Sequence, residues 1–125
     1  MRPTTLAEVA RLVAEGESFD RRLANFLDEF LAAPNDAALA ETPELLARFG
    51  ETGQVEDAYL AATAEELARS FHLSLPTWTD AEERKLRRPW FASPLASLRA
   101  ALLLESPAGF RSRNLFVSEN ALTRV

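Results

Sequence analysis

The residues of this sequence that could do chemistry are mostly basic, and they lie late in the chain. Between positions 84 and 91, cationic residues stand close to two aromatic ones: Arg84, Lys85, Arg87, Arg88, Trp90 and Phe91. Basic side chains neutralise phosphates and aromatic rings stack on bases, so this segment is compatible with nucleic-acid binding. Alternatively, the aromatic residues are core anchors and the arginines pair with carboxylates of the same chain or of a second copy.

A second group of hydrogen-bond donors follows downstream. Arg111, Arg113 and Asn114 directly precede the apolar run Leu115–Val117. Such donors either bind carbonyls at helix ends and brace a loop, or recognise an anion on a partner. Bracing is the simpler interpretation because it needs no ligand. The candidate partner-binding residues of the sequence are therefore Arg84, Arg87, Arg88, Arg111, Arg113 and Asn114.

Patterns typical of enzymes and metal sites are missing from the sequence. The absence of cysteine excludes disulfides, thiolate nucleophiles and cysteine-bound zinc. Adjacent carboxylates such as Glu65 and Glu66 diverge by about 100° on a helix, so we expect these residues, with Asp57, to form a solvated face. The single histidine, His72, lies at a predicted helix end, where it complements the helix dipole. No nucleophile elbow or glycine-rich phosphate loop is present, and we predict a non-enzyme without metal or cofactor.

The charge is divided unevenly along the chain. Residues 1–83 contain six Lys and Arg against 17 Asp and Glu, a net −11, whereas residues 84–125 contain eight against two, a net +6. Such polarity favours steering towards a charged partner, and it equally suits a homodimer in which acidic and basic faces meet, or simple solubility. The overall pI of about 4.9 argues against an autonomous nucleic-acid binder, for which a basic domain is expected.

The elements that must position these residues are predicted to be helices. The clearest is a stripe of apolar residues at helical spacing, Phe19, Leu23, Phe26, Leu27, Phe30 and Leu31. Thr5 and Glu8 form a capping box for a helix that ends at Gly16, and Thr79 and Glu82 form another for a short basic helix that Pro89 ends. We expect further helices from position 35 or 36, over 43–50 and 54–72, from Ser93-Pro94 and from Ser106-Pro107, and a final turn from Ser118.

Six or seven such helices predict an all-α protein, a single compact bundle with orthogonal packing. Because no linker separates the acidic and basic parts, we expect one domain over residues 1–125. In the helix after Pro94, Leu103 and Leu104 widen the apolar face, which predicts burial on more than one side. We expect Trp90 and Phe91 to pin the basic helix to the core.

The longest apolar run, Ala100–Leu104, is far shorter than the about 20 residues that a membrane span needs. No signal-peptide pattern is visible near the N-terminus. The sequence therefore predicts a soluble, cytoplasmic protein of bacterial type.

The C-terminal third resembles a family of small uncharacterised bacterial proteins. The similar strings are Arg88–Ala92, Leu98–Ala100, Leu104–Pro107, Phe110–Arg111 and Arg113–Ser118, with Phe26–Phe30 and Asp57–Ala61 upstream. Members of that family are often encoded beside nucleotidyltransferase-like proteins, an arrangement like that of toxin–antitoxin pairs. The resemblance implies an antitoxin-like or accessory role by binding the neighbouring protein, and it implies no known activity.

Together these observations predict a protein-binding domain, in its specific form an antitoxin-like partner of a nucleotidyltransferase-fold protein. The alternative is a nucleic-acid-associated regulator that uses the basic segment 84–113.

Overall fold

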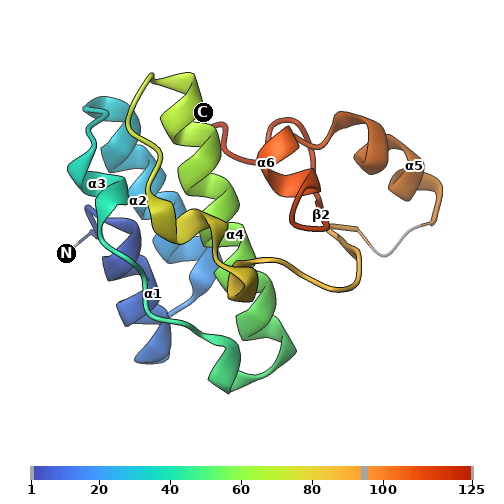
Figure 1. Ribbon diagram of the computed structural model, residues 1–125, viewed down its shortest axis with the longest axis horizontal. Helices are drawn as coiled ribbons and strands as arrows, with labels where there is room; N and C mark the ends of the chain where they lie inside the picture. Colours follow the sequence, from blue (N-terminus) through green and yellow to red (C-terminus); the bar gives the residue numbers. More distant parts are fainter. Residues whose placement is uncertain (1, 94–95, 125) are drawn as a thin grey trace.

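The computed structural model describes residues 2–93 and 96–124, and it is all-α, as the periodicity predicts (Figure 1). Its α-helices in the described residues are α1 (Leu6–Ala14), α2 (Phe19–Ala32), α3 (Ala37–Ala40), α4 (Glu51–Ser70), α5 (Ala96–Glu105) and α6 (Ala108–Arg111). Three single-turn 3-10 helices complete the helical set, η1 (Ala47–Phe49), η2 (Thr77–Asp80) and η3 (Glu82–Arg84). Two short strands, β1 (Trp90–Phe91) and β2 (Leu115–Phe116), pair in parallel, with Trp90 opposite Leu115.

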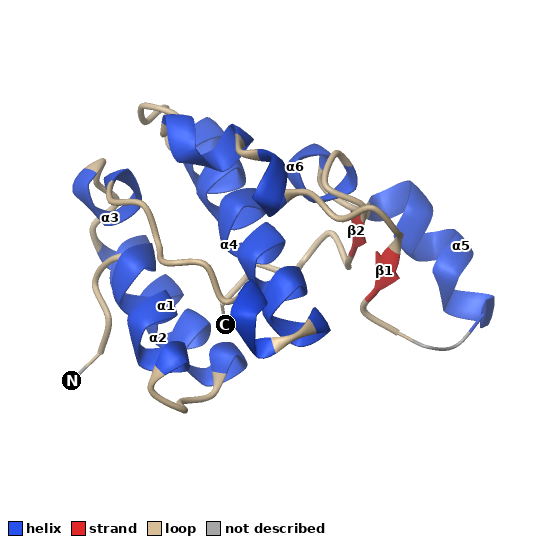
Figure 2. Cartoon of the chain, turned by 60° about the horizontal axis from the view of Figure 1, so that its bottom comes forward, coloured by secondary structure: helices blue, strands red, loops and turns tan. Residues whose placement is uncertain are grey.

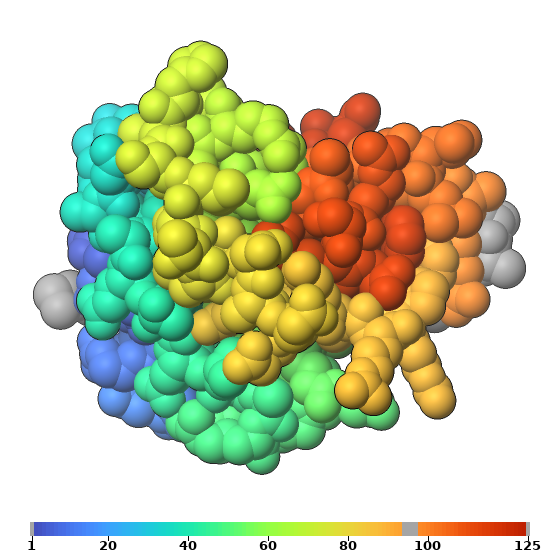
Figure 3. Space-filling model, in the orientation of Figure 1, coloured from blue at the N-terminus to red at the C-terminus, as the bar shows by residue number. Residues whose placement is uncertain are grey.

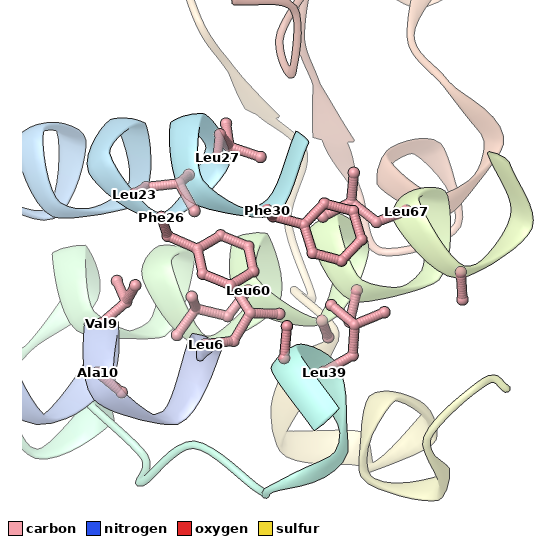
Figure 4. Packing of buried hydrophobic residues seen from close by; sticks show 14 of the residues in the cluster. Leu6, Val9, Ala10, Leu23, Phe26, Leu27, Phe30, Leu39, Leu60 and Leu67 are labelled. Atoms are coloured by element: carbon pink, nitrogen blue, oxygen red, sulfur yellow. The ribbon is translucent and has the colours of Figure 1, made fainter. Parts of the chain in front are cut away.

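The main core lies between α1, α2 and α4 (Figure 4). Four members of the α2 stripe are buried, whereas Leu31 at its edge is exposed. Phe26 and Phe30 stack with a centroid distance of 5.7 Å, and they pack with leucines of α1, α3 and α4. Thr5 caps α1 by accepting the Glu8 N–H, and Ser18 caps α2 by accepting the Arg21 N–H. Local signals therefore define α1 and α2 almost completely.

Helix α4 is the axis of the fold, because both core clusters pack against it (Figure 1). One face carries a stripe of small buried residues, Gly53, Ala61, Ala64 and Ala68, with Asp57 among them. At Gly53 an added Cβ would lie 1.8 Å from the Leu46 carbonyl oxygen, so the backbones of α4 and of the preceding segment are in direct contact. The small-residue stripe lets non-helical segments approach α4 closely.

Two predicted helices do not form. Over 43–50 the chain makes only η1, because the Leu46 and Ala47 N–H groups are held by the Asp57 carboxylate, from a different element. Over 79–88 it makes η2 and η3 and then runs without helix to β1. The expected capping box is wrong there, since the Thr79 hydroxyl donates to the Pro76 carbonyl instead. At 43–50 a tertiary contact with α4 replaces the helical hydrogen bonds, whereas at Thr79 a contact with the preceding turn replaces the cap.

Helix α5 projects from the body of the molecule, on the far side of the β1–β2 pair from α1–α4 (Figure 2). Leu102 is buried against the body side, but Leu98, Leu103 and Leu104 are exposed. The expectation that Leu103 and Leu104 are buried is therefore wrong. The predicted helix start at Pro94, with Leu95, lies outside the described residues. After α6 and β2 the chain returns to the body, where Arg124 pairs with Asp28 of α2 at 2.9 Å.

Candidate partner-binding surface

Arg84 lies inside the molecule rather than on its surface. Only 2% of its area is exposed, and its guanidinium lies 3.8 Å from the Asp57 carboxylate and 4.9 Å from the centre of the Trp78 ring. It also donates to the Pro43 carbonyl. Arg84 thus ties η3 to α4 and to the segment before η1, which is a structural role.

Asp57 completes this buried pair. Its two carboxylate oxygens accept the N–H groups of Leu46 and Ala47 at 2.7 and 3.0 Å. Burial raises the pKa of Asp57, while those two N–H groups and the Arg84 guanidinium offset part of the rise. The prediction that Asp57 belongs to a solvated face is wrong. A usable signal was its position, because Asp57 falls in register with Gly53, Ala61 and Ala64 on the buried stripe of α4.

Arg113 forms a second internal brace. It is 3% exposed, and its Nη1 donates to Glu65 Oε1 at 2.9 Å and to the Gly109 carbonyl at 2.7 Å. Its Nη2 donates to the Thr79 carbonyl at 2.8 Å. Arg113 therefore joins α4, α6 and η2, as the bracing interpretation predicts.

Glu65 and Glu66 are largely covered as well, so neither is part of a freely solvated face. Glu66 accepts the Gly109 N–H at 2.8 Å, and an added Cβ at Gly109 would lie 2.8 Å from the same carboxylate. The first turn of α6 is thus held against α4 through a main-chain contact.

Asn114 is half-buried and also structural. It adopts a left-handed backbone with φ of 63°, and its side-chain amide donates to the Leu86 carbonyl at 2.7 Å. Its own carbonyl accepts the Trp90 N–H at 2.8 Å. Asn114 therefore aligns the segment 86–90 with the start of β2.

The other three candidate residues, Arg87, Arg88 and Arg111, are exposed. None of them makes an ion pair within residues 2–93 and 96–124, and Arg99 of α5 is exposed too, with its guanidinium 4.9 Å from the centre of the Phe91 ring. The structure thus divides the six candidates into two internal braces, one alignment residue and three surface cations. The surface cations are the ones available to a partner.

Sequence reasoning missed the apolar surface beside these cations. Leu104 is 83% exposed, Leu103 and Leu98 nearly half, and Trp90 36%, contrary to the expected core position of this tryptophan. In the space-filling view α5 forms one end of the molecule, beyond the body (Figure 3). Its attachment is specific, because the buried Ser106 hydroxyl donates to the Leu102 carbonyl and accepts the Val117 N–H at 2.8 Å. The C-terminal end of α5 is therefore fixed to the body, while its leucines are exposed to solvent.

A groove of about 720 Å³ runs between α2, α4 and the C-terminal segment, and we call it the α2–α4 groove. Its floor is apolar, with Phe19, Leu23, Leu27, Val55, Tyr59 and Val117. Its rim carries the carboxylates of Asp20, Glu51 and Glu56, none of which forms an ion pair within the described part of the chain. Burial, with the nearby charges of Asp20 and Asp57, raises the pKa of Glu56. Burial together with Asp20 also raises the pKa of Tyr59 to about 12, so its phenol is neutral.

Among the described residues, no three His, Asp or Glu side chains come together as a set that could hold a metal ion. No helix in the described ranges combines the length and the apolar character that crossing a membrane requires.

The chain matches no family profile, and neither a curated protein nor a solved structure is detectably similar to it.

Proposed function

We propose that this chain is a protein-binding domain that contacts its partner through α5 and the neighbouring surface cations. The observation that carries the proposal is the exposure of leucines on a helix that leaves the body, with Leu104 at 83%. Exposed apolar side chains that cluster, rather than scatter singly, mark interaction sites in proteins. Arg87, Arg88 and Arg111 add unpaired positive charge in the same part of the chain.

The specific partner that we propose is a nucleotidyltransferase-fold protein, towards which the chain acts in an antitoxin-like manner. This part of the proposal is supported by the family resemblance of the C-terminal strings, and the exposed α5 lies within that region. An apolar helix that carries Arg99, together with exposed arginines from neighbouring parts of the sequence, fits a partner surface that combines an apolar groove with carboxylates.

Co-expression with a nucleotidyltransferase-fold protein, chosen from the genes that flank this one, followed by size-exclusion chromatography, tests the proposal. We expect co-elution at micromolar concentrations, and loss of co-elution in L103E/L104E. The control is Leu75→Glu, which introduces one carboxylate at an exposed leucine outside α5 and the groove, and it is compared with the single variant Leu104→Glu as well as with the double one. Separate elution of the two unmodified proteins, or equal loss in the control, would argue against this function.

The alternative function, a nucleic-acid-associated regulator, has fewer exposed arginines available than the sequence suggested. Of the five arginines that it would use, Arg84 and Arg113 are buried, while Arg87, Arg88 and Arg111 remain exposed. A fluorescence anisotropy titration with single-stranded and duplex DNA separates the two functions. Phosphate binding by three cations predicts a slope of log affinity against log salt of roughly −2 to −3, whereas a protein binder shows no titration.

A further inference from the structure

Helix α5 and the α2–α4 groove are two exposed surfaces that are complementary to each other. Helix α5 offers exposed leucines and Arg99, and Glu105 is its one acidic residue. The α2–α4 groove offers an apolar floor with three carboxylates that form no ion pair within the described residues, and its one basic lining residue, Arg124, already pairs with Asp28. The apolar parts match in character, and Arg99 is opposite in sign to the three carboxylates.

The groove also suits a narrow occupant better than a flat one. Its volume of about 720 Å³ is that of a pocket for a small molecule or a few side chains, which is roughly 300–1,000 Å³. Several side chains of one helix would fill such a space, whereas a broad protein face would not enter it. The chain's own α5 does not fill it, since α5 does not line the groove and projects away from α1–α4 (Figure 2).

The position of the groove relative to α5 decides which occupant is favoured. Trp90 and Ala92, which lead into α5, also line the edge of the groove. The helix that would dock and the groove that would receive it therefore come close to each other near β1. A two-fold axis close to Trp90 would bring each α5 to the groove of the other copy, and a closed pair would form without leaving either surface open.

We propose that two copies of this chain associate by exchange, with α5 of each copy docked in the α2–α4 groove of the other. The inference rests on the proposed function, because it uses the same α5 surface and names a second copy as one of its partners. Each of two identical contacts then has to bury only about half of the roughly 1,000 Å² that a specific interface needs. The contact removes Leu103 and Leu104, which flank the face of α5 opposite the buried Leu102, from water and brings Arg99 towards the rim carboxylates.

The test is the mass of the purified full chain, measured by sedimentation and by light scattering from about 1 to 300 µM. We expect a monomer–dimer equilibrium with a dissociation constant in the micromolar range. L103E/L104E on the α5 side should weaken it at least about tenfold, and Leu75→Glu should leave it unchanged. A strictly monomeric chain at 300 µM, or a dimer that L103E/L104E does not weaken, overturns the proposal.

Glu56→Gln tests the groove side without removing volume. The substitution takes away an unpaired, desolvated carboxylate, so it should not destabilise the monomer, yet it should weaken association about threefold to tenfold. Weakened association with an unchanged or raised melting temperature separates docking from a structural effect. Association that is unaffected by Glu56→Gln overturns the assignment of the groove as the acceptor.

Mixing provides the last measurement. The α5 variant L103E/L104E keeps an intact groove, and the groove variant E51K/E56K keeps an intact α5, so an equimolar mixture restores one of the two contacts. We expect the mixture to form more dimer than either variant alone, and no gain on mixing would contradict an exchanged pair. A monomeric chain that still co-elutes with the nucleotidyltransferase-like protein would overturn the exchange and leave the proposed function standing.

Discussion

The region around α4 and the region of α5 use the same residue types in opposite ways. Around α4, arginines and carboxylates are buried: Arg84 meets Asp57, and Arg113 meets Glu65, each among main-chain groups that need partners. At α5, leucines are exposed and nearby arginines are free of ion pairs among the described residues. The difference shows that the basic segment is not one functional patch. Its two most buried arginines stabilise the body, and the others mark the surface.

The buried charges have a common physical cause. Segments 43–50 and 76–86 pack on α4 mostly without regular helix, so their N–H and carbonyl groups lack helical partners. Burying such groups without hydrogen bonds costs about 1–3 kcal/mol each. In the first segment, Asp57 accepts two N–H groups and Arg84 donates to the Pro43 carbonyl. In the second segment, Arg113 donates to the Thr79 carbonyl. The charged side chains replace the missing ladder of hydrogen bonds.

We expect the largest loss of stability from Gly53→Ala, which changes the packing around α4 and leaves α5 unchanged. The new methyl group would overlap the Leu46 carbonyl, which is main chain and cannot rotate away. We expect a loss of at least about 3 kcal/mol in the free energy of unfolding, or failure to fold. Urea denaturation followed by circular dichroism measures it. Thr52→Ala, at an exposed position on the same turn, should change stability by less than about 0.5 kcal/mol.

Removing Arg84 should be nearly as severe. Arg84→Met keeps the length of the side chain but leaves the Asp57 carboxylate buried without its cation, so we expect a loss of about 3–5 kcal/mol. Arg87→Met, three residues away and exposed, should change stability by less than about 0.5 kcal/mol. The double variant R84M/D57N should be less destabilised than the sum of the two single variants. Additive losses would show that the pair is not coupled.

Arg113 and the exposed Arg111 can be compared in the same way, with a smaller expected loss of stability. Arg113→Met removes the donors to Glu65, Gly109 and Thr79, but its Nε already has no hydrogen-bond partner within the described residues. Because Glu65 remains partly exposed and can be hydrated, we expect a loss of about 2–3 kcal/mol. Arg111→Met should have almost no effect on unfolding. Equal effects at positions 111 and 113 would remove the distinction between brace and surface.

A pH experiment sharpens the comparison at the groove. The folded-state pKa of Glu56 is raised above 4.5, so folding favours the protonated carboxyl and its ionisation destabilises the fold. That cost is fully present above the raised pKa and disappears as the pH falls towards 4.5. Glu56→Gln should therefore gain up to about 0.5 kcal/mol at pH 7 and nothing at pH 4. Urea denaturation of the unmodified chain and of Glu56→Gln at pH 7 and at pH 4 gives the difference in their free energies of unfolding at each pH.

The smallest effect on stability is expected at α5. Leu104→Ser should change the free energy of unfolding by less than about 0.5 kcal/mol, because the side chain is already in water in the isolated chain. The same substitution should reduce binding of a partner, as seen in chromatography. A clear loss of stability would mean that Leu104 packs in the monomer, and it would contradict the contrast between the two regions.

Local patterns were enough to predict the main helices. The α2 stripe and the Thr5 cap depend on side chains within one or two turns, and both are present as expected. The failed helices at 43–50 and 79–88 contain acceptable local signals, but contacts with α4 and with Pro76 take their hydrogen bonds. A position such as Asp57 could have been found from its register with Gly53 and Ala61, provided that the buried face of α4 were known.

The sequence alone therefore determined the helical class, the course of α1, α2 and most of α4, and the uneven division of charge. Only the tertiary structure decided which arginines are inside, that β1 pairs with β2, and that α5 carries its leucines outward. The reason is range. Helical periodicity is written in neighbouring residues, whereas Arg84 is buried by Asp57, 27 positions before it, and Arg113 by Glu65, 48 positions before it. The number of charged residues in the sequence is the same whether an arginine is buried in an ion pair or exposed to solvent. Which of the two occurs depends on how distant segments pack.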